Sequence, residues 1–193
     1  MNILLMNSPK PKGMSLCTSE RRPPLGIGFL ISVLREHGHN VYFLDNCLNP
    51  KSNYRELITS KKIHYVGMHI DTLSFLEGCK ILFDIDGMRK NREWVGKIMV
   101  GGPHPSIMPE TIPSFVDYIV QGEGEEAVLD IVNGTQERII RKEFIENLDN
   151  LSSPAWDYFV GCRMTFRAII FQKLRFFLLI LHGDVLLIVL FVQ

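Results

Sequence analysis

The chain has 193 residues, enough for one domain with a sizeable core and a short additional segment. Its 21 Lys and Arg residues balance 21 Asp and Glu residues, so the chain lacks the basic surface expected of a nucleic-acid-binding protein. The four cysteines are far apart and form no CxxC or CxxxCxxC group, which favours reduced thiols in a cytoplasmic protein over a metal site or a disulfide framework.

Short apolar runs alternate with segments of helical periodicity. The first run, at 3–6, is too short for a signal peptide and is typical of a strand buried on both faces. A helix is predicted from Pro23-Pro24 to about His37, where Gly38 ends it. Further strands are predicted at 41–44, 63–70, 97–100 and 117–120, further helices at 54–60, 71–91 and 124–132, and a candidate edge strand at 136–141 after an Asn133-Gly134 turn.

Alternating strands and helices predict the α/β class, with a doubly wound parallel sheet and right-handed crossovers. We predict five strands in the flavodoxin-like (Rossmann-like) order 2-1-3-4-5. In that order the switch point lies between the first and third strands, where ligands of such sheets bind. The loops 7–20 and 71–74 should therefore face each other across a crevice.

The chain divides into a domain at 1–147, a connector at 148–164 that leaves the domain, and an apolar tail at 165–193. In the tail, fourteen apolar residues between 176 and 192 favour membrane insertion by about 4 to 8 kcal/mol in total, and Asp184 opposes it by about 3 kcal/mol. The span is also at the lower limit for crossing a bilayer. We interpret the tail as a segment that was not selected with the domain, from a shifted reading frame or a premature end. A membrane anchor is the less favoured alternative.

Three glycine-bearing segments lie where strands are predicted to end, at 23–28, 101–105 and 121–126. Glycine at the carboxyl end of a parallel strand lets a bulky ligand approach the backbone. Gly101 and Gly102 suit a flat ligand, and a tight turn is the alternative. His104 is placed either to bond a ligand or to lie in solvent.

Gly122, Glu123 and Gly124 precede the last predicted helix. The acidic side chains in this segment would repel phosphate but are favourable at a helix N-terminus. Capping of the helix and compensation of its dipole therefore explain most of the sequence pattern in this segment. A ligand that carries hydroxyl or amide groups is still compatible with it.

The sequence shows no nucleophile paired with a base. Neither Cys17 nor Ser8 has a histidine at a sequence spacing that would indicate a catalytic pair. Asp71 is more typical of a helix cap than of an acid–base group. The segment 26–28 lies within a helix and lacks the third glycine of a dinucleotide fingerprint, so NAD binding is discounted.

Six segments in order resemble the cobalamin-binding domain that precedes the catalytic barrel of B12-dependent radical SAM enzymes. They are Pro23–Gly26, Arg35–His39, Val41–Asp45, Val100–Pro105, Asp117–Glu125 and Leu148–Ala155. The resemblance covers roughly residues 1–160 and implies a flavodoxin-like domain that holds cobalamin with its nucleotide tail in the crevice. On this match, and with the glycine pattern, the candidate cofactor-binding residues are Ser8, Thr72, Gly101, Gly102, His104, Gly122, Glu123 and Gly124.

The chain departs from the family in two places. The Asp-x-His-x-x-Gly segment of other B12 proteins is missing at 7–13, so we expect base-off cobalamin with no protein histidine on cobalt. The radical SAM barrel and its CxxxCxxC loop are absent, and Cys162 stands alone. No [4Fe–4S] cluster or S-adenosylmethionine chemistry is therefore assigned to this chain.

The sequence thus predicts a cobalamin-binding module without catalytic activity of its own, either a fragment or a stand-alone N-terminal domain of a B12-dependent radical SAM enzyme. Two alternatives remain. One is a non-catalytic subunit whose radical SAM catalytic domain is a separate polypeptide. The other is a flavodoxin-like interaction domain without a ligand.

Overall fold

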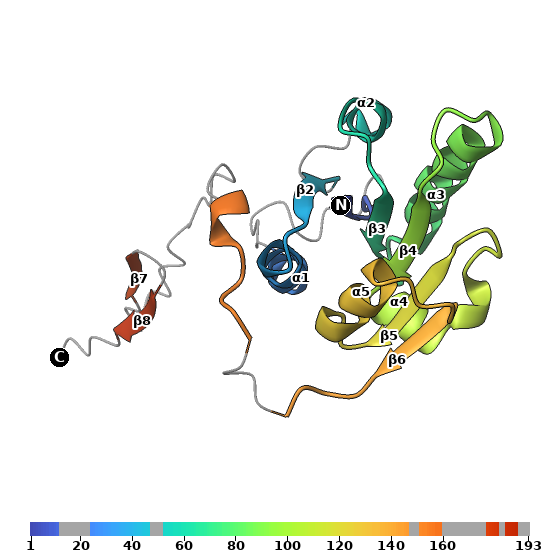
Figure 1. Ribbon diagram of the computed structural model, residues 1–193. Helices are drawn as coiled ribbons and strands as arrows, with labels where there is room; N and C mark the ends of the chain where they lie inside the picture. Colours follow the sequence, from blue (N-terminus) through green and yellow to red (C-terminus); the bar gives the residue numbers. More distant parts are fainter. Residues whose placement is uncertain (12–23, 47–51, 147–150, 160–176, 182–183, 189–193) are drawn as a thin grey trace.

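The computed structural model describes residues 1–11, 24–46, 52–146, 151–159, 177–181 and 184–188 (Figure 1). Six parallel strands form one sheet in the order β2-β1-β3-β4-β5-β6. Their bounds are β1 (Asn2–Asn7), β2 (Asn40–Asp45), β3 (Tyr65–His69), β4 (Lys97–Gly101), β5 (Tyr118–Gly122) and β6 (Ile139–Lys142). The predicted α/β class and the order 2-1-3-4-5 are confirmed, and the count of five strands is one too low.

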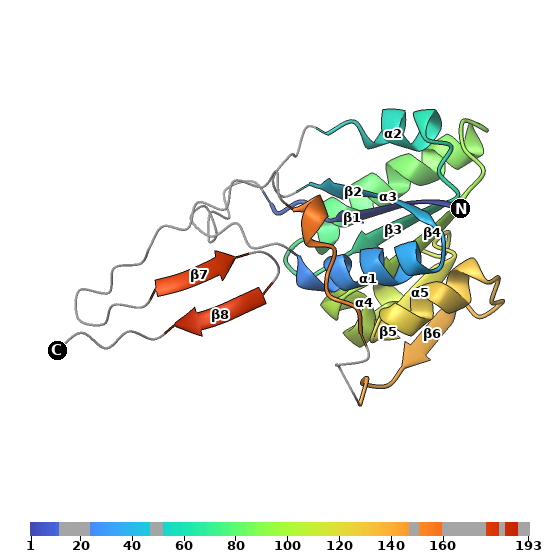
Figure 2. The ribbon, with the colours of Figure 1, turned by 60° about the vertical axis from the view of Figure 1, so that its left-hand side comes forward.

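Helices cover both faces of this sheet (Figures 1 and 2). The helices α1 (Leu25–Glu36) and α5 (Glu125–Val132) pack on one face, and α2 (Tyr54–Ser60) and α3 (Phe75–Lys90) pack on the other. The short helix α4 (Pro103–Ile107) and the 3-10 turn η1 (Pro109–Thr111) lie between β4 and β5. The helices predicted from the sequence are therefore present, and α4 replaces a simple turn after β4.

The central strand β1 packs against both helical layers. Ile3 and Leu5 contact the layer of α1 and α5, while Leu4 and Met6 contact the layer of α2 and α3. All four side chains are at most 3% exposed. Because successive side chains of a strand point to opposite faces, a strand covered on both sides needs an unbroken apolar run.

The sixth strand, β6, is short and lies at the edge of the sheet. It follows α5 and pairs in parallel with β5, with Ile119 opposite Ile139 and Val120 opposite Ile140. Of its four residues only Ile140 is buried. A four-residue strand with one buried side chain has almost no hydrophobic periodicity, which is why the sequence indicated it only as a candidate.

The apolar tail contains the strands β7 (Phe177–Leu181) and β8 (Asp184–Ile188), which pair antiparallel in a separate two-stranded sheet. In the part of the chain that the structure describes, no helix is long and apolar enough to span a membrane. The two apolar runs of the tail are therefore extended over these residues.

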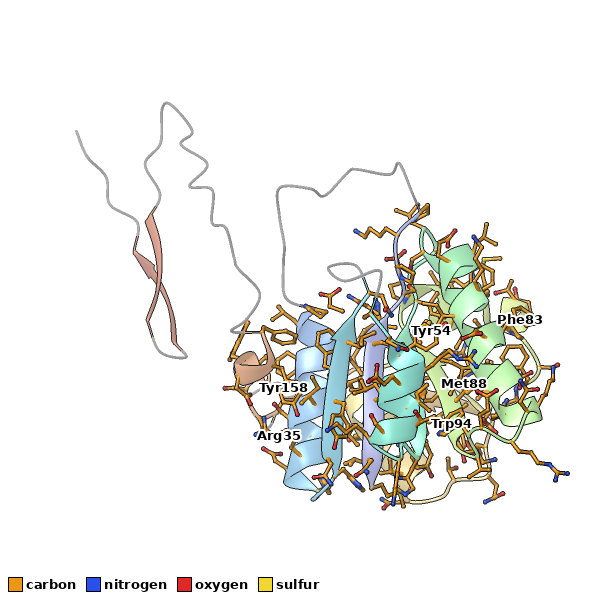
Figure 3. The ribbon with its side chains drawn as sticks, turned by 90° about the horizontal axis from the view of Figure 1, so that it is seen from above. Arg35, Tyr54, Phe83, Met88, Trp94 and Tyr158 are labelled. Atoms are coloured by element: carbon orange, nitrogen blue, oxygen red, sulfur yellow. The ribbon has the colours of Figure 1, made fainter. Side chains whose placement is uncertain are left out.

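Residues 151–159, which we expected to leave the domain, instead pack against α1 and β2. The backbone N–H of Ala155 donates to the Gly28 carbonyl at 3.1 Å, and the Tyr158 hydroxyl donates to the Val41 carbonyl at 2.6 Å. Tyr158 also lies beside Arg35 of α1, with the guanidinium 5.5 Å from the ring centroid (Figure 3). This segment is part of the folded unit.

Gly28 of α1 makes the close approach of this segment possible. A Cβ atom at Gly28 would lie 3.0 Å from Cβ of Pro154 and 3.1 Å from Cε2 of Phe159. Phe159 is 1% exposed and meets Phe43 of β2 edge to face at 5.5 Å. In a dinucleotide fingerprint, a glycine such as Gly28 would leave room for a ligand. Here Gly28 leaves room for the segment 151–159 to pack against α1.

If residues 151–159 are part of the core, Phe159→Ala should lower the free energy of unfolding by about 3 to 5 kcal/mol, because it removes a fully buried ring. The matched control is Phe144→Ala, since Phe144 is 87% exposed, and its change should stay within about 0.5 kcal/mol. Urea unfolding followed by far-UV circular dichroism measures both. Equal midpoints for the two variants would show that the segment does not contribute to the core.

Candidate functional site

A cavity of about 190 Å³ lies at the carboxyl ends of the central strands, on the face that α1 and α5 cover. Parallel strands end at the same edge of a sheet, and here the β1, β3, β4 and β5 backbones meet the first turns of both helices. The cavity is lined by Leu5, Met6, Gly26, Ile27, Leu30, Gly67, Met68, His69, Met99, Val100, Gly101, Gly102, Val120, Gly122, Glu123, Gly124, Glu125 and Val128. The lining is mainly apolar, with three ionisable side chains.

Missing side chains create much of this space. A Cβ atom at Gly67, in the middle of β3, would lie 2.6 Å from Cδ2 of Leu5 and 2.9 Å from Cε of Met99. Gly102 has a φ of +106°, and a Cβ atom there would lie 2.8 Å from the Ile70 carbonyl oxygen. A larger residue would fill the cavity at the first position and would strain the backbone at the second.

Five of the eight residues predicted from the sequence line this cavity. They are Gly101, Gly102, Gly122, Glu123 and Gly124. The structure thus brings together the two glycine segments that follow β4 and β5. Glu125 and Glu126 form the first turn of α5, as expected for acidic residues at a helix N-terminus.

His104 does not line the cavity and does not lie in solvent. Its ring is 4% exposed and stacks on Phe75 with a centroid distance of 4.0 Å. Its ring nitrogens pair with the hydroxyl oxygens of Thr111 at 2.9 Å and Thr72 at 3.4 Å. His104 and Thr72 therefore join α4 to the loop that precedes α3.

Ser8 is likewise buried away from the cavity. Its hydroxyl bonds to that of Ser74, and its backbone N–H donates to the His69 carbonyl at 3.0 Å. The backbone N–H of Ser74, the N-cap residue of α3, in turn donates to Oδ1 of Asp71 at 2.8 Å, so Asp71 fixes the turn before the helix and is not itself the cap. The loops after β1 and β3 do meet, and the residues of the first loop from 12 to 20 lie outside the described part of the chain.

Sequence reasoning missed two ionisable residues of the cavity, His69 and Glu125. His69 is the last residue of β3, and its side chain lies at the exposed edge of the cavity. Desolvation of the ring lowers its pKa, and the charge of Asp71 partly opposes this shift. The period-2 pattern of β3 could have revealed His69, because Gly67 and His69 share a face.

Glu125 is 7% exposed, and its Oε2 atom has no hydrogen-bond partner among the described residues. Burial raises the pKa of its carboxyl group, and the negative charge of Glu123 raises it further. Backbone N–H groups of Glu125 and Gly124 oppose both effects. A carboxyl group that tends toward its neutral form suits the apolar lining of the cavity.

The described residues contain no cluster of three or more His, Cys, Asp or Glu side chains that could hold a metal ion. Cys79 is a free thiol whose pKa is raised by burial, and Cys17, Cys47 and Cys162 lie outside the described residues. The described donor set therefore suits an organic ligand with apolar surface better than a bare ion.

The chain belongs to the family of B12 binding domains, because the family matches residues 12–132, more than half of its length. The predicted resemblance is thereby confirmed. A relative named "uncharacterized methyltransferase PH0819", of Pyrococcus horikoshii, is 24% identical over 181 residues. That match covers 81% of this chain and 38% of the relative.

Two solved structures have a similar fold. TsrM, a radical S-adenosylmethionine methyltransferase from Kitasatospora setae with cobalamin and a [4Fe-4S] cluster bound, matches with a TM-score of 0.52 and 20% identity, over 68% of this chain and 26% of TsrM. OxsB, a cobalamin-dependent S-adenosylmethionine radical enzyme with aqua-cobalamin bound, matches with a TM-score of 0.55 and 19% identity, over 79% of this chain and 20% of OxsB. The chain spans well under half the length of each relative.

The raised pKa of Glu125 predicts a pH effect on stability. The folded protein binds the Glu125 proton more tightly than the unfolded chain does. The resulting contribution to the free energy of unfolding is complete below the ordinary pKa of 4.5 and is lost as the pH rises through the raised pKa of the folded state. Glu125→Gln removes this loss and should raise the melting temperature at neutral pH relative to wild type, with a smaller difference in acid. The control for loss of a charge is Glu126→Gln, since that side chain is 71% exposed. Parallel pH profiles for wild type and Glu125→Gln would contradict the assignment.

Proposed function

We propose that this chain binds cobalamin in the base-off form, with the base of the nucleotide tail in the cavity beneath α1 and α5. The observation that carries the proposal is a glycine-shaped apolar cavity at the carboxyl ends of parallel strands in a B12-binding domain. The cavity is smaller than the roughly 300 to 1,000 Å³ typical of a pocket for a whole ligand. Its size favours a single ring system over the entire cofactor.

The residues of the cavity fit a benzimidazole base. Leu5, Leu30 and Met99 offer apolar contacts to a flat ring, and the missing side chain of Gly67 leaves room between the strands. Burial of the ring would remove apolar surface from water, at about 25 cal/mol per Å². Binding therefore has a hydrophobic driving force that does not depend on contacts to cobalt.

Polar atoms at the mouth would hold the hydroxyl and amide groups of the ligand. The backbone of Gly101 and Gly102 and the side chain of Glu123 lie there. Ser8, Thr72 and His104 would act indirectly, because they fix the loop before α3 and the start of α4. When bound, cobalamin supplies a cobalt centre that can carry a methyl group.

The likeness to TsrM and OxsB suggests the wider role. TsrM is named a radical S-adenosylmethionine methyltransferase and has cobalamin bound, OxsB is named a cobalamin-dependent S-adenosylmethionine radical enzyme, and PH0819 is named a methyltransferase. The sequence of this chain contains no CxxxCxxC segment. We infer that the chain presents cobalamin to a radical SAM catalytic domain, which would be supplied by further sequence or by a separate subunit.

A glycine on α1 allows a test that leaves the core intact. Gly26 lines the cavity, and apart from its chain neighbours and the backbone of its own helix no described atom lies within 4 Å of a Cβ atom built there. Gly26→Phe should therefore block the cavity and weaken cobalamin binding at least about tenfold, or about 1.4 kcal/mol. Titration of the full chain with hydroxocobalamin, followed by visible absorbance, measures the dissociation constant.

The matched control is Gly87→Phe, since Gly87 lies within α3, also has open space at its Cβ position and does not line the cavity. Its affinity should stay within about twofold of wild type, a difference of only about 0.4 kcal/mol. Equal losses in both variants would refute the site. Failure of the wild-type chain to bind cobalamin would instead favour the ligand-free interaction domain.

A further inference from the structure

His69 presents an imidazole ring at the mouth of the cavity. It ends β3, and the alternation of the strand puts its side chain on the face of Gly67, toward α1 and α5. Of the described residues that line the cavity, His69 alone has a nitrogen in its side chain. A ligand held over the carboxyl ends of the strands would therefore meet this ring.

Within the described part of the chain, the ring of His69 makes no hydrogen bond or ion pair, whereas the other four described histidines have polar partners. Those partners are the Val33 carbonyl for His37 at 2.8 Å, the Met1 amino group for His39 at 3.2 Å, the Asn2 N–H for His64 at 3.0 Å, and the Thr111 hydroxyl for His104 at 2.9 Å. No polar group of the described residues therefore competes with a ligand for the ring nitrogens of His69.

The backbone of His69 is held in place while its ring remains free. The residue pairs with Asn7 of β1 and Gly101 of β4, and its carbonyl accepts the Ser8 N–H at 3.0 Å. The ring lies against Gly102, where a Cβ atom would be 2.8 Å from Cδ2 and 2.9 Å from Nε2. The glycine therefore provides the space that the ring occupies.

The protonation state of His69 also suits a metal ligand. Desolvation lowers its pKa, with partial opposition from the charge of Asp71, so the neutral imidazole is favoured at neutral pH. The neutral ring has a free lone pair on one nitrogen, which is the form that binds metals.

We propose that His69 donates a ring nitrogen to the cobalt of cobalamin held at this mouth. The inference rests on the proposed function. The bond from the ring nitrogen to cobalt would replace the bond of a water molecule or of the nucleotide base, and the oxidation state of cobalt would not change. This assignment replaces our expectation of a site without a protein histidine, which considered only the segment after β1.

The test uses the full chain with its histidines labelled with ¹⁵N, loaded with cobalamin and reduced to the cob(II)alamin state. A single axial nitrogen splits the cobalt lines of the electron paramagnetic resonance spectrum. A histidine ¹⁵N gives doublets, a ¹⁴N base of the nucleotide gives triplets, and an oxygen ligand gives no nitrogen splitting. We expect doublets.

His69→Ala should lose the doublets while cobalamin stays bound, and added ¹⁴N imidazole should restore splitting as triplets. His39→Ala is the control and should keep the doublets, because its ring lies near the N-terminus and does not line the cavity. Bound cobalamin with triplets or without splitting in the wild-type chain would overturn the proposal. Doublets that persist in His69→Ala would overturn it as well. A chain that binds no cobalamin would contradict the proposed function itself.

Discussion

The fold depends on the burial of β1 between two helical layers. Its side chains are divided between the two hydrophobic clusters, and none of Ile3, Leu4, Leu5 and Met6 is more than 3% exposed. With β2 and β3 paired in parallel on either side, the carboxyl ends of the central strands meet at one edge. The cavity forms next to that edge because side chains are missing at Gly67, in the middle of β3, and at the glycines around the ends of β4 and β5.

The charged network lies away from this edge. Arg89 of α3 bonds to Asp117 at 2.7 Å and to Asp86 at 2.9 Å, and Asp117 also accepts the N–H of Ile98 near the start of β4. Burial alone would raise the pKa of Asp86, but Lys90 and Arg89 outweigh it and the pKa is lowered. The ion pairs thus fasten α3 to the amino ends of the strands, while the carboxyl ends keep their apolar cavity.

Residues 151–159 pack against α1 and β2. Their contacts with Gly28, Arg35 and Val41 couple this segment to the helix that forms one wall of the cavity. Gly26 and Ile27 in the first turn of α1 line the cavity, so the segment 151–159 is coupled to that wall of the cavity.

Much of the fold was predictable because its signals are local. The unbroken apolar run at 3–6 predicts a doubly covered strand, and the pattern at 54–60 gives α2 with the bounds that the structure shows. The glycine segments likewise predicted five residues of the cavity, because glycine after a parallel strand marks close approach of a ligand. The strand β6 lacked such a signal, since it buries only Ile140.

The remaining properties depend on contacts between residues far apart in the chain. From the sequence, His104 and His69 were both histidines near strand ends. In the structure the first is buried against Phe75, while the second lines the cavity and has no polar partner among the described residues. In the sequence, Gly28 was only part of an incomplete dinucleotide fingerprint. The structure shows that Pro154 and Phe159 pack against it. The sequence by itself thus determined the class of fold and the glycines at the strand ends, because these are local features of the chain, while the strand order was predicted by analogy with flavodoxin-like sheets. Only the tertiary structure decided which polar side chains face the cavity, because burial and hydrogen-bond partners are set by segments that packing brings together.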